Sequence, residues 1–498
     1  EIMPSLVGSE MCIRDSLNIV FYNQSMITQE KAVIKEFAQF DESIIKAVQK
    51  IAGKDNVISD IEGLYAYSFD CAHIPFSKEY PRLVVFPQNT QQVSDIVKLA
   101  NKNRIPIIER GAASNHAGGC SPVRGGIILH FSKMNQILEI NNSDLTCKVQ
   151  PGVVVGDLQK EALKTGLFFP PDPSNLAVST IGGGIALSSG GPRAFKYGTF
   201  KDYVLDMEVV LADGTILRTG APTVKNVTGY NLTQLIVGSE GTLAVITEAT
   251  LRLIPAPETT NVLLAYFESI EKAVDAVSAI INNHLTPSVV DLIDKKTVQT
   301  IENFYPTGLL CDKEAVLLIE IDGDSASVAH QQEKIIELCR NNGAQNIDCA
   351  NDEKHRQKIW TARRSAFGAC AQLAPNVITE DVVVPRSKIA ALSKGILEIS
   401  RKYNLITMVM GHIGDGNIHP NFALDLRDKK QKENFEKAKA ELFRLAVKLG
   451  GTLSGEHGIG CQKANFLPIA LDKTALNIMI QLKRVFDPNY ILNPDKML

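Results

Sequence analysis

Residues 110–119 read RGAASNHAGG, in which small side chains and three glycines follow a short apolar run at residues 105–108. Glycine lets the backbone turn sharply, and it lets a ligand approach backbone N–H groups closely. Upstream, residues 82–86 are typical of a buried strand and residues 89–99 of a capped helix, and residues 105–108 are typical of a second strand. The sequence therefore predicts a compact β-α-β unit that leads into a ligand-binding loop.

Two further glycine-rich blocks follow in the same region. Residues 170–192 contain PPDPS, STIGGG and SSGGP, and residues 226–242 contain NVTGY and GSEGT. Between them, Asp213-Gly214 predicts the turn of a β-hairpin. Three such blocks indicate an extended, phosphate-bearing ligand. The sequence has neither GxxxxGK[ST] nor a GxGxxG that opens a helix after a strand, so a dinucleotide on a scaffold other than a P-loop or Rossmann fold is expected.

Length and composition exclude several classes of function. The 498 residues suffice for two or three domains, and a net charge of −3 gives no broad basic field for nucleic acid. No apolar run approaches the length of a membrane span. The nine cysteines form no CxxC pair, which excludes the usual iron–sulfur and structural-zinc spacings and fits reduced thiols. We therefore predict a cytoplasmic protein that attaches to the inner membrane, if at all, peripherally through a partner.

The ends of the predicted units follow from composition. Residues 1–16 lack an initiator methionine, helical periodicity and the pattern of a signal peptide, so we interpret residues 1–25 as a non-native leader. Residues 26–80 are predicted to form an N-terminal helical segment. Pro255-Ala-Pro257 predicts a boundary between a first domain, residues 81–257, and a second, residues 258–498. The strands and helices predicted after residue 257 alternate in a ferredoxin-like α+β pattern.

The stretch GHIGDGNIHP, residues 411–420, predicts a hairpin with Asp415-Gly416 at its turn. In that register His412 lies directly opposite His419, with Cβ atoms roughly 4.5–5.5 Å apart. Two imidazoles at that separation can share one metal ion. The alternative interpretation is two ordinary polar residues near a loop.

Together these stretches resemble FAD-linked oxidases of the vanillyl-alcohol-oxidase type, and within them the group of glycolate oxidase FAD subunits and D-lactate dehydrogenases. The resemblance rests on RGAASNHAGG, DPSNLAVSTIGGGIALSSGGPRAFKYG, TGYNLTQLIVGSEGTLAVIT, GHIGDGNIH and SGEHGIG, and it covers residues 80–498. It implies an α+β fold: an FAD-binding domain of the vanillyl-alcohol-oxidase type at residues 81–257, and a ferredoxin-like cap domain that carries the metal site and ends in a C-terminal helical segment.

The resemblance also implies which residues surround FAD. They lie in the three glycine-rich blocks and near the C-terminus: Arg110, Gly111, Ala112, Ala113, Ser114, Asn115, His116, Gly118, Gly119, Pro171, Asp172, Ser174, Thr180, Gly182, Gly183, Ser188, Gly191, Gly238, Glu240, Gly241, Ile246 and Asn493. Gly184 and Ser188 replace common asparagines of the family, and His116 stands where some relatives carry leucine. Noncovalent FAD is expected, with a covalent bond through His116 as the less favoured alternative.

Oxidation of a 2-hydroxy acid requires a group that polarises the hydroxyl and a base that takes its proton. His412, His419 and Glu456 form a two-nitrogen, one-carboxylate set that suits a divalent ion such as Zn, Mn or Fe and leaves positions open for substrate. Coordination would lower the pKa of the hydroxyl. His457 is the predicted general base, because an imidazole titrates near neutral pH.

The substrate carboxylate requires an anchor, and a guanidinium can hold it through two parallel hydrogen bonds. The resemblance favours Arg363 over Arg364 for this role. The alternative for both arginines is a solvated surface charge. Asn417 and Glu380 are weaker candidates for contacts near the substrate.

We therefore predict an FAD-dependent dehydrogenase of a small D-2-hydroxy acid, glycolate or D-lactate. Its electrons would pass to a separate iron–sulfur subunit, an electron-transfer flavoprotein or a quinone-linked protein. A second copy of the chain, in a homodimer, is another possible partner. The first alternative is the same fold acting on a bulkier acid such as D-2-hydroxyglutarate, or as an ether-lipid synthase. Thr379-Glu380-Asp381 lacks the lysine expected for a distal carboxylate. The second alternative is a noncatalytic flavoprotein subunit. The presence of His412, His419, Glu456 and His457 argues against it, because an inactive subunit would not need them.

Overall fold

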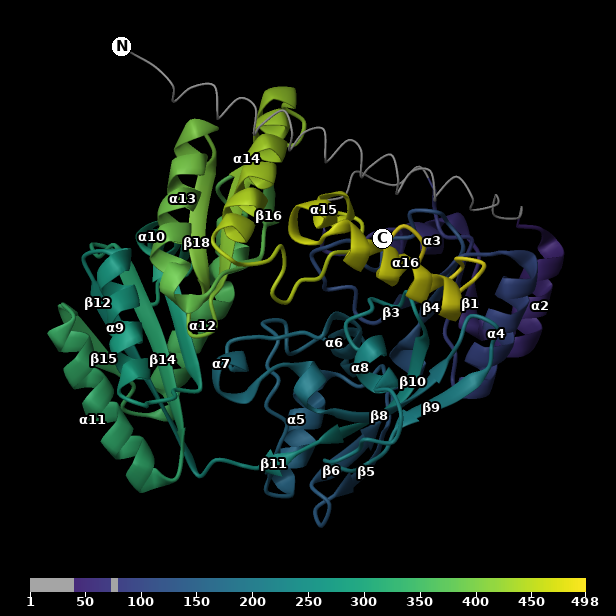
Figure 1. The fold of residues 1–498 in the computed structure, drawn as a ribbon, viewed down its shortest axis with the longest axis horizontal. Helices are drawn as coiled ribbons and strands as arrows, with labels where there is room; N and C mark the ends of the chain where they lie inside the picture. The colour runs from purple at the N-terminus through teal and green to yellow at the C-terminus, as the bar shows by residue number, and fades with distance from the viewer. Residues whose placement is uncertain (1–39, 73–78) are drawn as a thin grey trace.

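The computed structural model of the chain describes residues 40–72 and 79–498 (Figure 1). The predicted leader and the first part of the predicted N-terminal helix lie outside these residues. The later part of that helix is α2 (Glu42–Ala52), which Asp41 caps with its side chain. It is followed by α3 (Ile61–Ala66).

The predicted β-α-β unit is confirmed, with one strand inserted into it. β2 (Leu83–Val85) and β3 (Ile107–Arg110) both run parallel to β4 (Ile127–His130), which lies between them, and β1 (Val57–Ile58) pairs with β2. The crossover helix α4 (Thr90–Asn103) begins where the Asn89 side chain accepts a hydrogen bond from the backbone N–H of Gln92. The loop 110–119 thus leaves the C-terminal end of a parallel strand.

A five-stranded antiparallel sheet follows, and its strand order is β5-β6-β10-β8-β9. The strands are β5 (Ile137–Asn141), β6 (Thr146–Val149), β8 (Val204–Val210), β9 (Ile216–Gly220) and β10 (Val245–Arg252). The predicted Asp213-Gly214 hairpin is confirmed as β8 and β9. Helices α5 (Val155–Lys164) and α6 (Ile181–Leu187) share a core with this sheet, and β7 (Leu167–Phe168) pairs with β11 (Ile254–Pro255). Short helices α7 (Ala194–Tyr197) and α8 (Leu232–Ile236) complete this part.

The cap is one large sheet with the strand order β15-β12-β14-β13-β18-β19-β16, and β17 pairs with β19. Its strands are β12 (Thr259–Phe267), β13 (Val289–Asp294), β14 (Ala315–Gly323), β15 (Asn346–Cys349), β16 (Asn376–Thr379), β17 (Val382–Val383), β18 (Ile406–His412) and β19 (Asn417–Leu424). Its helices are α9 (Ile270–Asn282), α10 (Lys295–Phe304), α11 (Ser325–Asn341), α12 (Glu353–Cys370), α13 (Ile389–Lys402) and α14 (Lys429–Lys448).

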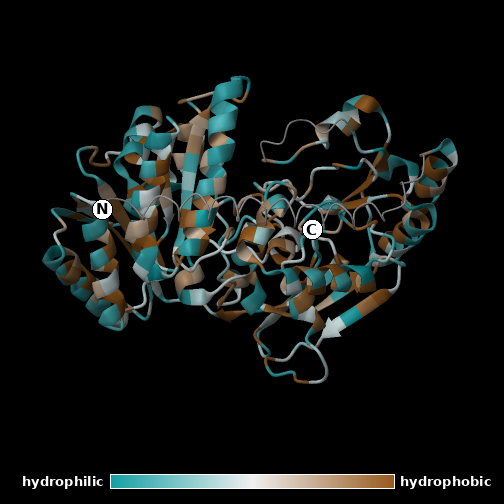
Figure 2. Cartoon of the chain, turned by 45° about the horizontal axis from the view of Figure 1, so that its top comes forward, coloured by the Kyte–Doolittle hydropathy of each residue, from teal (hydrophilic) through white to brown (hydrophobic). Residues whose placement is uncertain are grey.

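Alternate residues of the cap strands enter different cores. On β14, Leu317 and Ile319 face the core shared with α9, α11, α13 and α14, whereas Val316 and Leu318 face the core on the side of α12. Both faces of this sheet are therefore covered. Figure 2 shows hydrophobic residues concentrated on the strands and hydrophilic residues on the outer faces of the helices.

The C-terminal segment returns from the cap to the first sheet. After α15 (Leu467–Ala470) and α16 (Lys473–Phe486), Ile491 and Leu492 enter the core beneath β3, and the backbone N–H of Asn493 donates to Ile107 O. The end of the chain thus lies beside loop 110–119 (Figure 1). Within the described residues, no helix combines the length and the apolar character needed to cross a bilayer.

Candidate functional site

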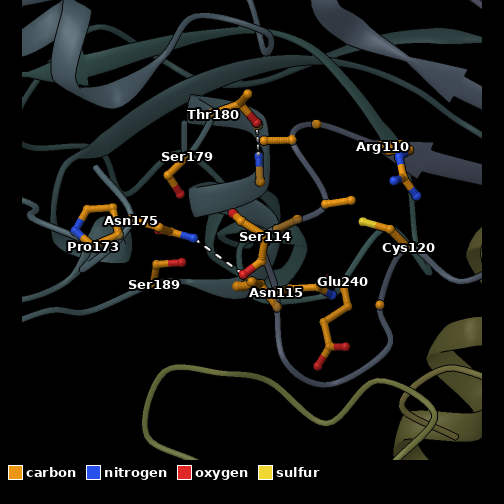
Figure 3. A pocket seen from close by; sticks show the side chains of 18 of the residues that line it. Arg110, Ser114, Asn115, Cys120, Pro173, Asn175, Ser179, Thr180, Ser189 and Glu240 are labelled. Carbon is orange, nitrogen blue, oxygen red and sulfur yellow. Dashed lines mark hydrogen bonds between the residues drawn. The ribbon is translucent and has the colours of Figure 1, made fainter. Parts of the chain in front are cut away.

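A cavity of about 350 Å³ lies where the glycine-rich blocks meet the cap, and Figure 3 shows the side chains around it. One wall is loop 110–120, and a second is the start of α6. Glu456, His457 and α12 border it from the cap.

Loop 110–119 packs closely against the start of α6, where Gly111 contacts the Thr180 side chain. A Cβ on Gly111 would lie 2.2 Å from Thr180 Oγ1, so a larger residue would push the loop away from the helix. Thr180 caps α6 by accepting a hydrogen bond from the N–H of Gly183, and Asn175 Nδ2 donates to Ser114 O (Figure 3). At the start of the loop, the Arg110 guanidinium donates to the carbonyls of Tyr67 and Phe69. The first half of the loop is therefore fixed by hydrogen bonds.

Glu240 and Asn493 tie distant segments together at the cavity. The Glu240 carboxylate accepts hydrogen bonds from the backbone N–H groups of Ile459 and Gly460, each 2.7 Å long. Asn493 Nδ2 donates to Gly119 O at 2.9 Å and to Glu240 O at 2.7 Å. Burial raises the pKa of Glu240, and the two N–H donors oppose that rise. These hydrogen bonds thus join four segments that are far apart in sequence, at Gly119, Glu240, residues 459–460 and Asn493.

Most of the predicted cofactor residues line this cavity: Arg110, Gly111, Ala112, Ala113, Ser114, Asn115, His116, Gly119, Ser174, Thr180, Gly182, Gly183, Glu240, Gly241, Ile246 and Asn493. Six others do not line it: Gly118, Pro171, Asp172, Ser188, Gly191 and Gly238. Asp172 lines an adjoining, smaller cavity instead, and four of the six have contacts that support the wall. Asp172 pairs with Arg193 at 3.5 Å, and a Cβ on Gly191 would lie 2.0 Å from Asp172 O. Ser188 ends α6 in the left-handed conformation, and Gly238 N donates to Ile185 O.

Several lining residues were not predicted from the sequence: Glu109, Cys120, Phe131, Pro151, Pro173, Asn175, Ser179, Ala186, Leu187, Ser189, Ala244, Arg364 and Phe367. Seven of them lie inside the quoted motifs, and Glu109 and Cys120 flank the first motif directly. Arg364 and Phe367 belong to a row on α12 with Trp360 and Arg363, at helical spacing. That spacing was visible in the sequence and would have placed all four on one face.

A smaller cavity of about 110 Å³ adjoins the first one. It is lined by that row of α12, by residues of the cap strands and loop 454–460, and by residues of the first domain: His116, Asp172, Pro173, Ser174, Pro192, Trp360, Arg363, Arg364, Phe367, Thr379, Met410, His419, Asn421, Glu456 and His457. Glu456 and His457 line both cavities.

The predicted register of the β18–β19 hairpin is wrong by two residues. Met410, not His412, lies opposite His419, and residues 413–416 connect the strands. Because side chains alternate with a period of two, a shift of two residues keeps both histidines on the same face of the sheet. Their ring centroids are 5.1 Å apart. The inference of a histidine pair therefore holds in a different register.

His412, His419 and Glu456 form a donor set that fits a metal ion. Their ligand atoms all lie within 4.8 Å of one another, and Glu456 Oε1 is 3.6 Å from His412 Nε2 and 3.3 Å from His419 Nε2. His412 Nδ1 lies 2.6 Å from Asp291 Oδ1, which orients the ring and directs Nε2 toward Glu456. Among the described residues, His412 Nε2 has no hydrogen-bond partner although it is buried. Burial opposes the charged imidazolium, but the Asp291 carboxylate raises the pKa of His412 well above its usual value.

Asp291 was not predicted, and it also holds Arg363. The Arg363 Nε–H donates to Asp291 Oδ2 at 2.6 Å, and Arg363 is only 8% exposed. The interpretation of Arg363 as a solvated surface charge is therefore wrong. Arg364 lies over the Trp360 ring at 5.3 Å and borders both cavities.

Asp381 fixes the loop that carries Glu456 and His457. Its Oδ2 accepts hydrogen bonds from Ser454 Oγ and from the backbone N–H groups of residues 455, 456 and 457, at 2.6–3.1 Å. Burial would raise the pKa of this carboxyl, but the positive charge of Lys463 and the hydrogen bond from Ser454 hold it well below its usual value. Asp381 is therefore an anion that organises the loop.

Asn417 and Glu380 do not line either cavity. Asn417 Nδ2 donates to Asp381 Oδ1 at 2.8 Å, and the Glu380 carboxylate lies 3.1 Å from Lys439 and 3.6 Å from Lys463 in the cap interior. Both residues support the cap rather than face the cavities.

His457 stacks on His419, with ring centroids 5.0 Å apart and planes 10° apart. Burial lowers the pKa of His457 to about 4, so it does not titrate near neutral pH as expected from its residue type. The imidazole is neutral at pH 7. A neutral imidazole at the junction of two cavities can accept a proton.

Comparisons with known proteins agree with this arrangement. Residues 256–497 match the model of FAD linked oxidases, C-terminal domain, and residues 81–220 match an FAD binding domain. The chain is 44% identical to glycolate oxidase subunit GlcD of Bacillus subtilis, over 90% of this chain and 95% of that protein. It is 36% identical to D-lactate dehydrogenase of Anaerostipes hadrus, over 85% and 90% of the respective chains.

Solved structures share the fold at low sequence identity. The structure of p-cresol methylhydroxylase matches with a TM-score of 0.75 at 18% identity, and covers 91% of this chain and 96% of its own. The structure of 4-ethylphenol oxidase from Gulosibacter chungangensis matches with a TM-score of 0.74 at 20% identity, with the same coverage. The α+β fold of the vanillyl-alcohol-oxidase type is thereby confirmed.

Proposed function

The chain belongs to the FAD-linked oxidases and is an FAD-dependent oxidoreductase, and from that premise we propose that it oxidises a small D-2-hydroxy acid, glycolate or D-lactate, to the 2-oxo acid. The observation that carries this proposal is the position of Glu456 and His457, which border the large cavity and the small one at once. The names of the relatives, glycolate oxidase subunit and D-lactate dehydrogenase, support the same class of substrate.

The residues around the large cavity fit FAD. Gly111, Gly182 and Gly183 leave backbone close to the cavity, and the hydrogen bonds of Glu240 and Asn493 fix the far wall. FAD, when bound, accepts the α-hydrogen of the substrate with two electrons. The protein has to hold the acid in one orientation and to take the hydroxyl proton.

We assign the carboxylate of the acid to Arg363. Asp291 accepts the Nε–H of its guanidinium, and Nη1 donates a weak hydrogen bond to Met410 Sδ at 3.5 Å, so the remaining Nη–H groups are left for the small cavity. The pair is rigid because both partners are buried. A guanidinium held in this way binds a carboxylate with defined geometry.

His412, His419 and Glu456 would hold a divalent ion, which would act as a Lewis acid on the substrate oxygens. His457 takes the hydroxyl proton, since its ring is neutral and its loop is fixed by Asp381. The donor set excludes none of Zn, Mn and Fe.

Reduced flavin has to pass its electrons on. The relatives from Bacillus subtilis and Escherichia coli are named as subunits, which supports a separate partner as the electron acceptor. A cytoplasmic location, with contact to a membrane only through such a partner, belongs to the same proposal.

Anaerobic bleaching of the flavin absorbance tests the reaction. The protein is mixed with glycolate, D-lactate, L-lactate and D-2-hydroxyglutarate in separate experiments. Rapid bleaching with glycolate or D-lactate, abolished by a chelator and restored by added metal, is the expected result. Protein with full FAD and metal that bleaches with none of these acids contradicts the proposed function.

A further inference from the structure

His116 comes from the FAD-binding side but lies at the junction of the two cavities. It is half-buried in loop 110–119 and borders both the large cavity and the small one. Its ring centroid lies 5.1 Å from that of His457, with planes 37° apart. It lies 5.3 Å from the ring of Phe367 on α12, in an edge-on arrangement. His116 is therefore wedged between two rings of the cap.

This contact extends a row of imidazoles. His457 is stacked on His419, and its ring also contacts the ring of His116. The cap supplies His419 and His457, and loop 110–119 supplies His116. The row thus joins the metal-ligand set to the wall of the large cavity.

The remaining walls of the small cavity restrict where an acid can point. The Arg363 guanidinium and the His419 imidazole form a cationic and polar side, to which the carboxylate and the hydroxyl are attracted. Phe367 and His116 form a different part of the wall, next to the large cavity. A volume of about 110 Å³ is also well below the 300–1,000 Å³ of typical drug-sized sites.

We propose that His116 is a specificity-determining residue, whose imidazole closes the small cavity beside His457 and limits the substituent on C2 of the acid to a hydrogen or a methyl group. This inference rests on the proposed function, because it takes the small cavity as the site of the acid. It assigns to His116 a steric role that needs no change in its charge.

Two variants test whether the volume of the His116 side chain or its imidazole ring is responsible for the selectivity. His116→Ala removes the wall and joins the cavities, whereas His116→Leu keeps an apolar side chain of comparable reach. His330→Ala, at an exposed position of α11, is the matched control for loss of a histidine.

The measurement is the shift of the flavin absorption band when the FAD-loaded protein binds pyruvate or 2-oxohexanoate, which requires no turnover. The wild type, H330A and H116L are expected to bind pyruvate at least about tenfold more tightly than 2-oxohexanoate, because each excluded methylene weakens binding about tenfold or more. H116A is expected to lose most of that preference. An unchanged preference in H116A overturns the inference, as does failure of both acids to bind the wild type.

The bleaching experiment distinguishes this result from failure of the proposed function. A wild type that bleaches with D-lactate while H116A keeps the wild-type binding preference refutes only the role of His116. A second outcome supports the role of His116 and refutes the oxidation. In it, the wild type binds pyruvate selectively and H116A does not, yet the wild type bleaches with no 2-hydroxy acid.

Discussion

At the scale of single residues, two buried aspartates organise the site. Asp381 accepts four hydrogen bonds from loop 454–457 through one oxygen atom. In Asp381→Asn the amide can present an N–H group to some of these donors, and an unpaired buried N–H costs about 1–3 kcal/mol each. We expect kcat to fall about 100-fold or more while FAD stays bound. Steady-state kinetics and flavin absorbance measure the two effects.

The matched control for this variant is Asp324→Asn, at the N-cap of α11, where asparagine caps a helix as well as aspartate does. The control is expected to retain wild-type activity and melting temperature. Full activity of Asp381→Asn would show that the loop does not depend on the negative charge.

Asp291 is the second such residue, since it contacts both His412 and Arg363. Loss of a carboxylate that orients a metal-bound histidine typically weakens metal binding about 10–100-fold. We expect this loss in Asp291→Asn, together with a higher KM for the acid. Competition with a chelator measures metal affinity directly. Asp275→Asn, at an exposed position of α9, should change neither quantity, and wild-type metal affinity in Asp291→Asn would refute the role.

The buried carboxyl group of Glu109 should make the free energy of unfolding depend on pH. Burial raises the pKa of Glu109 to about 8, and both of its oxygens lack hydrogen-bond partners among the described residues. Between about pH 4.5 and 8 the folded state holds a proton that the unfolded state has lost, so this residue lowers stability as pH rises, by at most about 1.4 kcal/mol per pH unit. Glu109→Gln should remove that slope. Melting temperatures at pH 5 to 8.5 test it, and an unchanged slope contradicts it.

The candidate residues that sequence could predict are those in local motifs. His412 and His419 are seven positions apart, and Glu456 and His457 are adjacent. Each pair therefore lies in one short stretch, a hairpin or a loop, and could be predicted from local sequence. Asp291 lies on β13 and Asp381 between β16 and β17. Only the sheet order β13-β18-β19-β16, with β17 paired to β19, brings both to the histidines. A carboxylate in a strand carries no local signal of such a contact. Tertiary topology therefore supplies what the motifs lack.

At the scale of elements, the hairpin shows why its register was mispredicted. A two-residue type I′ turn needs positive φ at both central residues, but only Gly416 has it, and Asp415 does not. A Cβ on Gly416 would moreover lie 2.1 Å from Val384 O, so the turn is shaped by the segment after β17 as well as by its own sequence. The Asp-Gly pair predicts the existence of the hairpin correctly, but tertiary packing sets its length.

Gly416→Ala should therefore disrupt the hairpin more than backbone strain alone would. Gly166→Ala is the matched control, since Gly166 has φ +76° but a Cβ there meets no atom within 4 Å. We expect the control to cost about 1–2 kcal/mol. Gly416→Ala should cost more and lower metal affinity with FAD retained. Thermal unfolding and chelator competition compare the two, and equal losses would contradict the role of Val384.

At the scale of the whole molecule, the C-terminal segment returns to the first sheet and adds Asn493 to the lining of the large cavity. Sequence patterns predicted the β-α-β unit, the Asp213-Gly214 hairpin and the alternating elements after residue 257, but the helices α5, α6, α10 and α13 were missed. The eight-stranded cap pairs strands up to about 120 positions apart, and Ile491 and Leu492 pack under β3, more than 380 positions earlier in the chain. Such long-range pairings leave no local pattern. The resemblance to a family, not the periodicity, identified Asn493 as a cofactor residue.

Asn493 tests whether this return of the chain shapes the FAD site. It joins Gly119 to Glu240 through two hydrogen bonds, and it has a φ of +40°. Asn493→Gly removes the side chain without backbone strain, because glycine tolerates positive φ. Two carbonyls then lose their donor, and each loss costs about 1 kcal/mol or more.

We expect the dissociation constant of FAD to rise about tenfold or more in Asn493→Gly, measured by the quenching of flavin fluorescence as the apoprotein is titrated. Asn489→Gly is the control, because Asn489 bonds Asn101 and does not line the cavity. The control should bind FAD like the wild type. Equal affinities in both variants would mean that the C-terminal segment supports the first sheet but does not shape the cofactor site.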